Sequence, residues 1–251
     1  MSSKLIPLIA GNWKMHKTLA EARALAREVL QGLAGGLKVE VVLSPPFTAL
    51  AAVAQELENS PVRLAGQDTF WELEGAYTGA ISPRMLKDVG CRYVIVGHSE
   101  RRQHFGDTNR TVNLKLKAAL AGGLVPIFCL GETLPQRQSA QTLEVVAEQL
   151  REGLAGLADE PKADLVVAYE PVWAIGTGQT ATPQQAQEVH SFIRGLLPEI
   201  LGTADIRILY GGSVTPDNAA SLMAEPDING ALVGGASLKA PSFLKIITSA
   251  G

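Results

Sequence analysis

A short apolar run followed by a longer amphipathic segment recurs about every 31 residues along this chain, the pattern of alternating strands and helices. The runs are nearly continuous in apolar residues, as expected of parallel strands that are buried on both faces. Because parallel neighbours are joined by right-handed crossovers, each strand is expected to be followed by a helix outside the sheet. The expected strands are Leu5–Ala10, Val39–Leu43, Val62–Ala65, Tyr93–Val96, Val125–Cys129, Leu165–Ala168, Ile206–Leu209 and Ala231–Val233.

Helix-start signals follow several of these runs. Thr18 is placed to cap a helix over Leu19–Leu33, where apolar residues recur at helical spacing. Thr182-Pro183 has the pattern of a cap followed by proline in the first turn, and it opens a helix over Gln184–Leu197. Shorter helices are expected over Thr215–Ala224 and from Ala240 onward.

The number of strands and the length of 251 residues fit a single-domain (β/α)8 barrel over residues 1–251. No linker or low-complexity stretch marks a domain boundary. A doubly wound open sheet is the alternative, but it normally carries GxGxxG after its first strand. Here that turn is Gly11-Asn12-Trp13-Lys14. The closed barrel is therefore the predicted fold.

Composition excludes several classes of protein. Hydrophobic residues make up 46% of the chain and charged residues 19%, which excludes intrinsic disorder. The net charge of −3 suggests neither a nucleic acid nor an anionic membrane as partner. Cys91 and Cys129 have no CxxC spacing, so we expect neither a disulfide scaffold nor a metal site. Without an export-like or membrane-spanning segment, the cytoplasm is the expected compartment.

The residues that follow the strands decide the chemistry, because the active site of such a barrel forms at the C-terminal ends of its strands. Lys14 and Asn12 follow the first strand, His98 and Glu100 the fourth, and Glu170 the sixth. A cation, an imidazole and a carboxylate around one barrel mouth favour general acid–base chemistry.

Two glycine turns follow the last two strands. Gly211-Gly212-Ser213 and Gly234-Gly235 allow the main chain to approach an anion closely and to point N–H groups at it. Barrels frequently bind phosphate in these two loops. Combined with the acid–base groups, the turns predict a phosphorylated carbonyl compound as substrate.

The segment from Pro171 to Ala181 is apolar at its centre and punctuated by glycines, which suits a hinged lid. Apolar residues at Val172–Ile175 are awkward in a surface loop unless they cover something. A lid that excludes water would strengthen the electrostatics beneath it.

The motifs GNWKMH, VGHSERR, AYEPVWAIGTG, YGGSV and LVGGASL, in this order and spacing, resemble those of the triosephosphate isomerase family essentially from end to end. The resemblance implies the TIM barrel. It also implies the interconversion of dihydroxyacetone phosphate and D-glyceraldehyde 3-phosphate, in glycolysis and gluconeogenesis, with no metal or organic cofactor.

The resemblance also implies residue roles. Glu170 removes a carbon-bound proton and returns it to the neighbouring carbon, while neutral His98 polarises the carbonyl. Lys14 and Asn12 stabilise the developing oxyanion, and Glu100 orients Lys14. The implied substrate-binding residues are Asn12, Lys14, Gly176, Gly212, Ser213, Gly234 and Gly235.

The family is typically a homodimer that docks through the loop Gln67–Gly79, with Thr78 inserting beside the active site of the partner subunit. Phe70, Trp71 and Tyr77 are expected to be exposed there, which independently suggests a partner surface. Three residues depart from the common family pattern, at the interface loop, in a buried ion pair and at the lid hinge: Ala80, Asp107 and Gln179.

Two other functions remain as alternatives. A Schiff-base aldolase would use Lys14 as nucleophile, but such a lysine needs a desolvated or cationic setting, and Lys14 is expected to face Glu100. A catalytically inactive barrel that serves as a binding module should have lost Lys14, His98 or Glu170, and all three are present.

Overall fold

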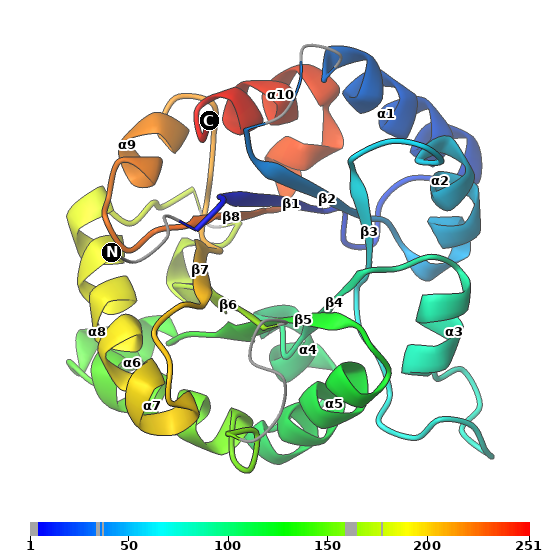
Figure 1. The fold of residues 1–251 in the computed structure, drawn as a ribbon. Helices are drawn as coiled ribbons and strands as arrows, with labels where there is room; N and C mark the ends of the chain where they lie inside the picture. The colour runs from blue at the N-terminus through cyan, green and yellow to red at the C-terminus, as the bar shows by residue number, and fades with distance from the viewer. Residues whose placement is uncertain (1–4, 34–35, 37, 159–164, 177) are drawn as a thin grey trace.

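Eight parallel strands close into a barrel, each strand hydrogen-bonded to the next and the eighth to the first (Figure 1). The computed structural model describes residues 5–33, 36, 38–158, 165–176 and 178–251. The strands are β1 (Leu8–Asn12), β2 (Glu40–Ser44), β3 (Arg63–Gly66), β4 (Tyr93–Val96), β5 (Val125–Leu130), β6 (Val166–Tyr169), β7 (Arg207–Tyr210) and β8 (Gly230–Val233). The predicted closed barrel is thus confirmed, and the open sheet is excluded.

Helices surround the barrel as an outer ring (Figure 1). They are α1 (Leu19–Gly32), α2 (Leu50–Glu56), α3 (Pro83–Asp88), α4 (Ser99–His104), α5 (Asn109–Ala121), α6 (Leu134–Gln138), α7 (Thr142–Gly153), α8 (Pro183–Leu201), α9 (Ala219–Met223) and α10 (Ala240–Thr248). Short 3-10 turns lie at η1 (Phe47–Ala49), η3 (Val172–Ala174) and η4 (Gly235–Leu238). Among the described residues, no helix is both long and apolar enough to cross a membrane.

The strands are buried on both faces, as their composition predicted. Alternate residues such as Leu8, Ala10 and Leu232 fill the inside of the barrel. The residues between them, such as Ile9 and Val233, pack outward against the helices in a larger cluster. The barrel is therefore a packed core that holds the strand ends in fixed positions, which is what a site built from several strands requires.

Two predicted helices differ from the observed ones by four residues at one end. Helix α8 runs to Leu201 instead of Leu197 and includes Pro198 in its last turn. There a proline forfeits one hydrogen bond, whereas continuing the helix buries Leu201. Helix α9 begins at Ala219 instead of near Thr215, because the residues before it form a turn.

The segment Gln67–Gly79 between β3 and α3 projects away from the barrel at the lower right of Figure 1. The expectation of three exposed aromatic rings is correct only for Tyr77, which is 46% exposed. Phe70 and Trp71 are half-buried, because their rings stack with centroids 4.0 Å apart and Phe70 also contacts Tyr77 at 4.7 Å.

Candidate active site

A cavity of about 470 Å³ opens at the C-terminal ends of the strands. Nine of the ten predicted site residues line it, contributed by the loops after β1, β4, β6, β7 and β8: Asn12, Lys14, His98, Glu100, Gly176, Gly212, Ser213, Gly234 and Gly235. The tenth, Glu170, lies behind the cavity wall and is 1% exposed. Segments far apart in sequence therefore meet at one site.

The Lys14 side chain is held by its own backbone and by a neighbouring carboxylate. Its φ of +51° turns the chain after β1, and its N–H donates to Asn12 Oδ1 at 3.0 Å. Gln67 Nε2 donates to the carbonyl oxygens of Lys14 and Ser44, both at 2.9 Å. Lys14 Nζ donates to Glu100 Oε1 at 2.5 Å. These contacts fix an ammonium group at the cavity rim, as substrate orientation requires.

His98 is the residue at which β4 passes into helix α4. Gly97, with φ +74°, makes the sharp turn, and His98 is the N-cap of the helix. His98 Nδ1 accepts the backbone N–H of Glu100 at 3.2 Å. A neutral imidazole in this arrangement therefore carries its proton on Nε2, since Nδ1 is used as an acceptor. This nitrogen lies 3.0 Å from Glu170 Oε1.

Glu170 directly follows β6 and is buried beside Gly131 and Gly211. Its Oε2 accepts the backbone N–H of Ser99 at 2.8 Å. Its Oε1 receives no aligned hydrogen bond from any described residue, although His98 Nε2 is nearby. A Cβ on Gly211 would lie 2.8 Å from Glu170 Cγ, so only glycine leaves this side chain room. A buried carboxylate oxygen with spare hydrogen-bonding capacity is suited to accept a proton.

The two groups shift each other's pKa. Burial lowers the pKa of His98, but the Glu170 carboxylate outweighs burial and the net shift is upward. Burial raises the pKa of Glu170, and the contacts with His98 and the Ser99 N–H outweigh it, so the net shift is downward. Opposite shifts of this kind are what a base and a carboxylate in contact produce. Both shifts depend on the contact between the two side chains.

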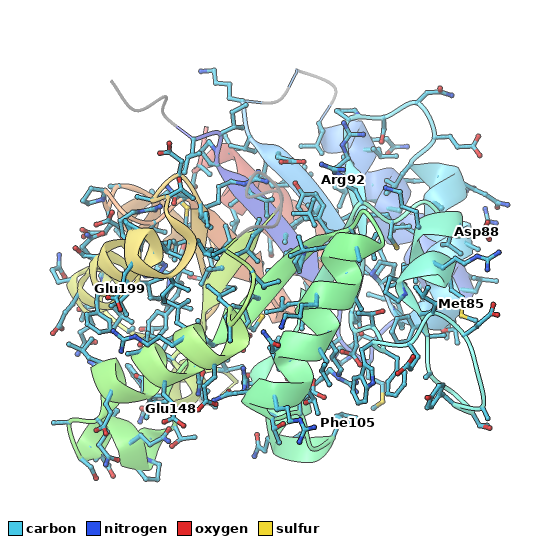
Figure 2. All side chains as sticks on the ribbon, turned by 60° about the horizontal axis from the view of Figure 1, so that its bottom comes forward. Met85, Asp88, Arg92, Phe105, Glu148 and Glu199 are labelled. Carbon is cyan, nitrogen blue, oxygen red and sulfur yellow. The ribbon has the colours of Figure 1, made fainter. Side chains whose placement is uncertain are left out.

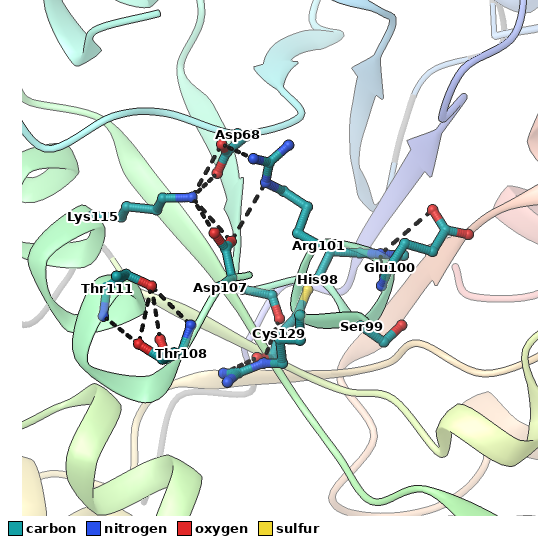
Figure 3. Close-up of polar contacts among 12 residues, drawn as sticks. Asp68, His98, Ser99, Glu100, Arg101, Asp107, Thr108, Thr111, Lys115 and Cys129 are labelled. Carbon is teal, nitrogen blue, oxygen red and sulfur yellow. Dashed lines mark hydrogen bonds and ion pairs between the residues drawn. The ribbon is translucent and has the colours of Figure 1, made fainter. Parts of the chain in front are cut away.

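A cluster of four charges, Lys115 buried and the other three half-buried, anchors helix α4 (Figure 3). Lys115 of α5, which is 3% exposed, donates to Asp68 Oδ1 and to Asp107 Oδ1, each at 2.8 Å. Arg101 of α4 lies 3.0 Å from Asp68 Oδ2 and 3.4 Å from Asp107 Oδ2. The cluster joins the loop after β3 to the helix that begins at His98. Asp107, noted above as a departure from the family pattern, reaches both cations.

The glycines in the turns after β7 and β8 differ in what a side chain at their positions would meet. A Cβ on Gly212 would lie 2.3 Å from the Tyr210 hydroxyl, so this glycine is required by packing within the protein. A Cβ on Gly234 would lie 3.3 Å from Lys14 Cε, and a Cβ on Gly235 would meet nothing within 4 Å. The turn after β8 therefore presents bare backbone to the cavity beside the Lys14 ammonium group, as an anion site requires.

The expected lid segment begins with η3 and is anchored behind the site. Trp173 Nε1 donates to Glu132 Oε1 at 2.8 Å, and the Tyr169 hydroxyl donates to Glu132 Oε2 at 3.0 Å. Ile175 and Gly176 reach the cavity. Thr177 of the predicted lid lies outside the described residues.

Several residues that hold this site were not among the predicted ones. Glu132, which is fully buried, is the second residue after β5, so the strand-end position that singled out Glu170 could have found it. Ser99 lies within the VGHSERR motif and Gln67 directly follows β3, but nothing in the sequence indicates the distant partners of their hydrogen bonds. Among the described residues, no three His, Cys, Asp or Glu side chains are placed to hold a metal ion.

Comparison with known proteins gives a consistent result. A sequence model of the family described as triosephosphate isomerase matches residues 7–250. The triosephosphate isomerase of Moorella thermoacetica is 60% identical over 243 residues, which cover 96% of this chain and 97% of that protein. That of Chloroflexus aurantiacus is 56% identical over 245 residues, covering 96% and 98%. The crystal structure of triosephosphate isomerase from Bartonella henselae is 39% identical, with a TM-score of 0.90, covering 98% of this chain and 99% of that one.

Proposed function

The chain belongs to the triosephosphate isomerase family, and from this we propose how its residues interconvert dihydroxyacetone phosphate and D-glyceraldehyde 3-phosphate. One observation carries the assignment of roles. Oε1 of buried Glu170 receives no aligned hydrogen bond from the described residues and lies 3.0 Å from His98 Nε2, directly behind the cavity wall. A base and a proton donor thus lie side by side where a carbonyl compound would be bound.

Glu170 is the base that moves a proton between the two substrate carbons. It must first leave the Ser99 N–H and His98, because in its present position it does not line the cavity. Those two contacts are what lower the pKa of Glu170, whereas burial raises it. Moving toward the substrate therefore makes the carboxylate a stronger base.

His98 and Lys14 stabilise the enediolate that the proton transfer creates. Once Glu170 has moved away, burial is the dominant influence on His98, so the imidazole stays neutral and its Nε2–H donates to the substrate oxygens. The Lys14 ammonium group, oriented by Glu100, balances the negative charge, and Asn12 holds the Lys14 backbone. Donors fixed in advance need no reorganisation during the reaction.

The phosphate is bound by main-chain N–H groups of Ser213, Gly234 and Gly235, beside Gly212. Gly176 adds its N–H when the lid closes, and the closed lid excludes water from the enediolate. What supports this arrangement is the open space at Gly235 and the position of Gly234 against Lys14.

Isomerisation in deuterium oxide tests the proposal. The account predicts that glyceraldehyde 3-phosphate formed from dihydroxyacetone phosphate carries deuterium on C2, because the Glu170 carboxyl group exchanges its proton with solvent. Glu170→Gln should abolish both turnover and exchange. Borohydride trapping of a covalent Lys14 adduct with substrate would instead support the Schiff-base alternative.

A homodimer assembled through Gln67–Gly79 is also proposed, with Thr78 beside the active site of the partner subunit. Exposed apolar side chains support it: Met15 is 94% exposed, Phe105 66% (Figure 2) and Tyr77 46%. Such a surface needs covering. Sedimentation equilibrium should give twice the chain mass of 26.5 kDa, and Tyr77→Asp should shift the protein toward monomer.

The cytoplasm is the proposed compartment. Both cysteines, Cys91 and Cys129, are free and buried, which fits a reducing environment. Fractionation of the source cells should recover the activity with the cytoplasmic proteins.

A further inference from the structure

The main-chain N–H groups of Ser213, Gly234 and Gly235 proposed to bind phosphate are called here the phosphate cradle. It consists of the turn after β7 and the turn after β8, and each turn is held by a side chain that does not line the cavity. We propose that Asn218 and Ser237 are positioning residues. Ser237 fixes the Gly234–Gly235 peptide group in the orientation that binds phosphate, and Asn218 fixes the Ser213–Val214 peptide group, which adjoins the Ser213 N–H. This inference rests on the proposed function, since it assigns a purpose to two residues through the cradle that they support.

Asn218 spans the turn after β7. Its Nδ2 donates to the Ser213 carbonyl at 3.0 Å, while its Oδ1 accepts the Thr215 N–H at 2.8 Å. Residues 213–215 belong to no helix or strand, so no regular hydrogen-bond ladder sets their conformation. The amide side chain takes the place of that ladder by pinning both ends of the turn.

Ser237 performs the same task in the turn after β8. Its Oγ donates to the Gly234 carbonyl at 2.7 Å, and its backbone N–H donates to the same oxygen at 2.8 Å. Gly234 has φ −86° and ψ −110°, which belongs to neither helix nor strand. Because a peptide unit is planar and trans, a carbonyl held on one side directs the Gly235 N–H to the opposite side. Gly235 lines the cavity and Ser237 does not.

Ser237 is itself fixed to the barrel. Its side chain is fully buried, and a Cβ placed on Gly11 of β1 would lie 3.0 Å from its Cβ. The cradle is thereby attached to the strand that leads to Asn12 and Lys14. Two donors on one carbonyl also polarise the peptide group, which strengthens the hydrogen bond that the Gly235 N–H donates.

The test compares a phosphorylated substrate with one that lacks phosphate. For Asn218→Ala and Ser237→Ala, the measured quantities are the Ki of inorganic phosphate and kcat/KM for D-glyceraldehyde 3-phosphate and for D-glyceraldehyde. Loss of either side-chain hydrogen bond should raise the Ki of phosphate about fivefold and lower kcat/KM for the phosphorylated substrate by a similar factor. Turnover of D-glyceraldehyde should stay within about twofold of the original protein, because it does not use the cradle.

Matched controls remove similar hydrogen bonds elsewhere. Near the end of α10, Thr248 Oγ1 donates to the Leu244 carbonyl and Ser249 Oγ to the Lys245 carbonyl, both at 2.9 Å, and neither residue lines the cavity. Thr248→Val and Ser249→Ala should leave all three constants unchanged. Should an alanine variant fold poorly, Asn218→Ser shortens the side chain so that it no longer spans the turn, and Ser237→Cys replaces the hydroxyl by a much weaker donor.

The inference is overturned if the Ki of phosphate does not change, or if turnover of D-glyceraldehyde falls as far as that of the phosphorylated substrate. The second result would mean that these residues support the whole site and not the cradle. Failure of the proposed function is distinguishable, since the unmodified protein would then not isomerise D-glyceraldehyde 3-phosphate at all.

Discussion

Shortening Glu170 by one methylene should nearly abolish catalysis, because the main chain that carries it cannot advance to compensate. The Glu170 N–H donates to the Leu130 carbonyl at 2.8 Å. A Cβ on Gly131 would lie 1.8 Å from the Glu170 carbonyl oxygen, so the two chain segments are already in contact. On the other side, the Gly211 N–H donates to the Tyr169 carbonyl at 2.7 Å. The backbone at Glu170 is therefore held between β5 and β7.

In Glu170→Asp the carboxylate consequently retreats by about one C–C bond, roughly 1.5 Å. A misplacement of about 1 Å is able to cost about 100-fold in rate, so kcat should fall at least about 100-fold, or about 2.7 kcal/mol. KM should change little, because Lys14 and the glycine turns remain in place.

The assay couples formation of dihydroxyacetone phosphate to NADH oxidation, with circular dichroism as the check on folding. Glu199→Asp is the matched control, since Glu199 is an exposed residue near the C-terminal end of α8 (Figure 2) and does not line the cavity. A kcat for Glu170→Asp within about threefold of the original would refute the role of Glu170, because it would show that carboxylate position does not limit the reaction.

Three further predictions concern buried groups. Burial lowers the pKa of His190 to about 4, so the unfolded chain binds a proton first as pH falls from 6.5, and about 3 kcal/mol of stability should be lost by pH 4. Urea unfolding across this range should show that loss, and His190→Gln should flatten it; equal slopes for the two proteins would contradict this. Lys115→Met leaves Asp68 and Asp107 with Arg101 alone and should cost about 3–5 kcal/mol in urea unfolding, whereas a change below about 1 kcal/mol would contradict the pairing. Cys129→Ala should keep kcat and lose about 1 kcal/mol of stability, and an inactive but stable variant would show that the thiol is more than a packing group.

The fold could be predicted from the sequence because the apolar runs are strong and regular. The run at Tyr93–Val96 coincides with β4, whereas the run at Leu5–Ala10 was placed too early and β1 is Leu8–Asn12. The true limits of β1 depend on its neighbours, since Leu8 pairs with Glu40 on one side and with Gly230 on the other. The sequence of one strand does not show where its pairing begins and ends, because the register is set by the neighbouring strands as well.

The residues around the cavity could be predicted for a related reason. Strand ends are visible in the sequence, and a barrel brings them to one rim. Asn218 and Ser237 could not be found in this way, because each acts through a hydrogen bond to a main-chain carbonyl. Gln67 does directly follow β3, but its two carbonyl partners are equally hidden in the sequence. Short polar residues in turns are common, and their partners become visible only when the chain is folded.

The most direct test of the account is a crystal structure with an unreactive phosphate-bearing carboxylate analogue of the substrate. The account predicts phosphate oxygens about 3 Å from the N–H groups of Ser213 and Gly235. It also predicts that the Glu170 carboxylate has left the Ser99 N–H and faces the carbon atoms of the ligand. A phosphate bound elsewhere, or a Glu170 carboxylate still on Ser99 with the cavity occupied, would contradict it.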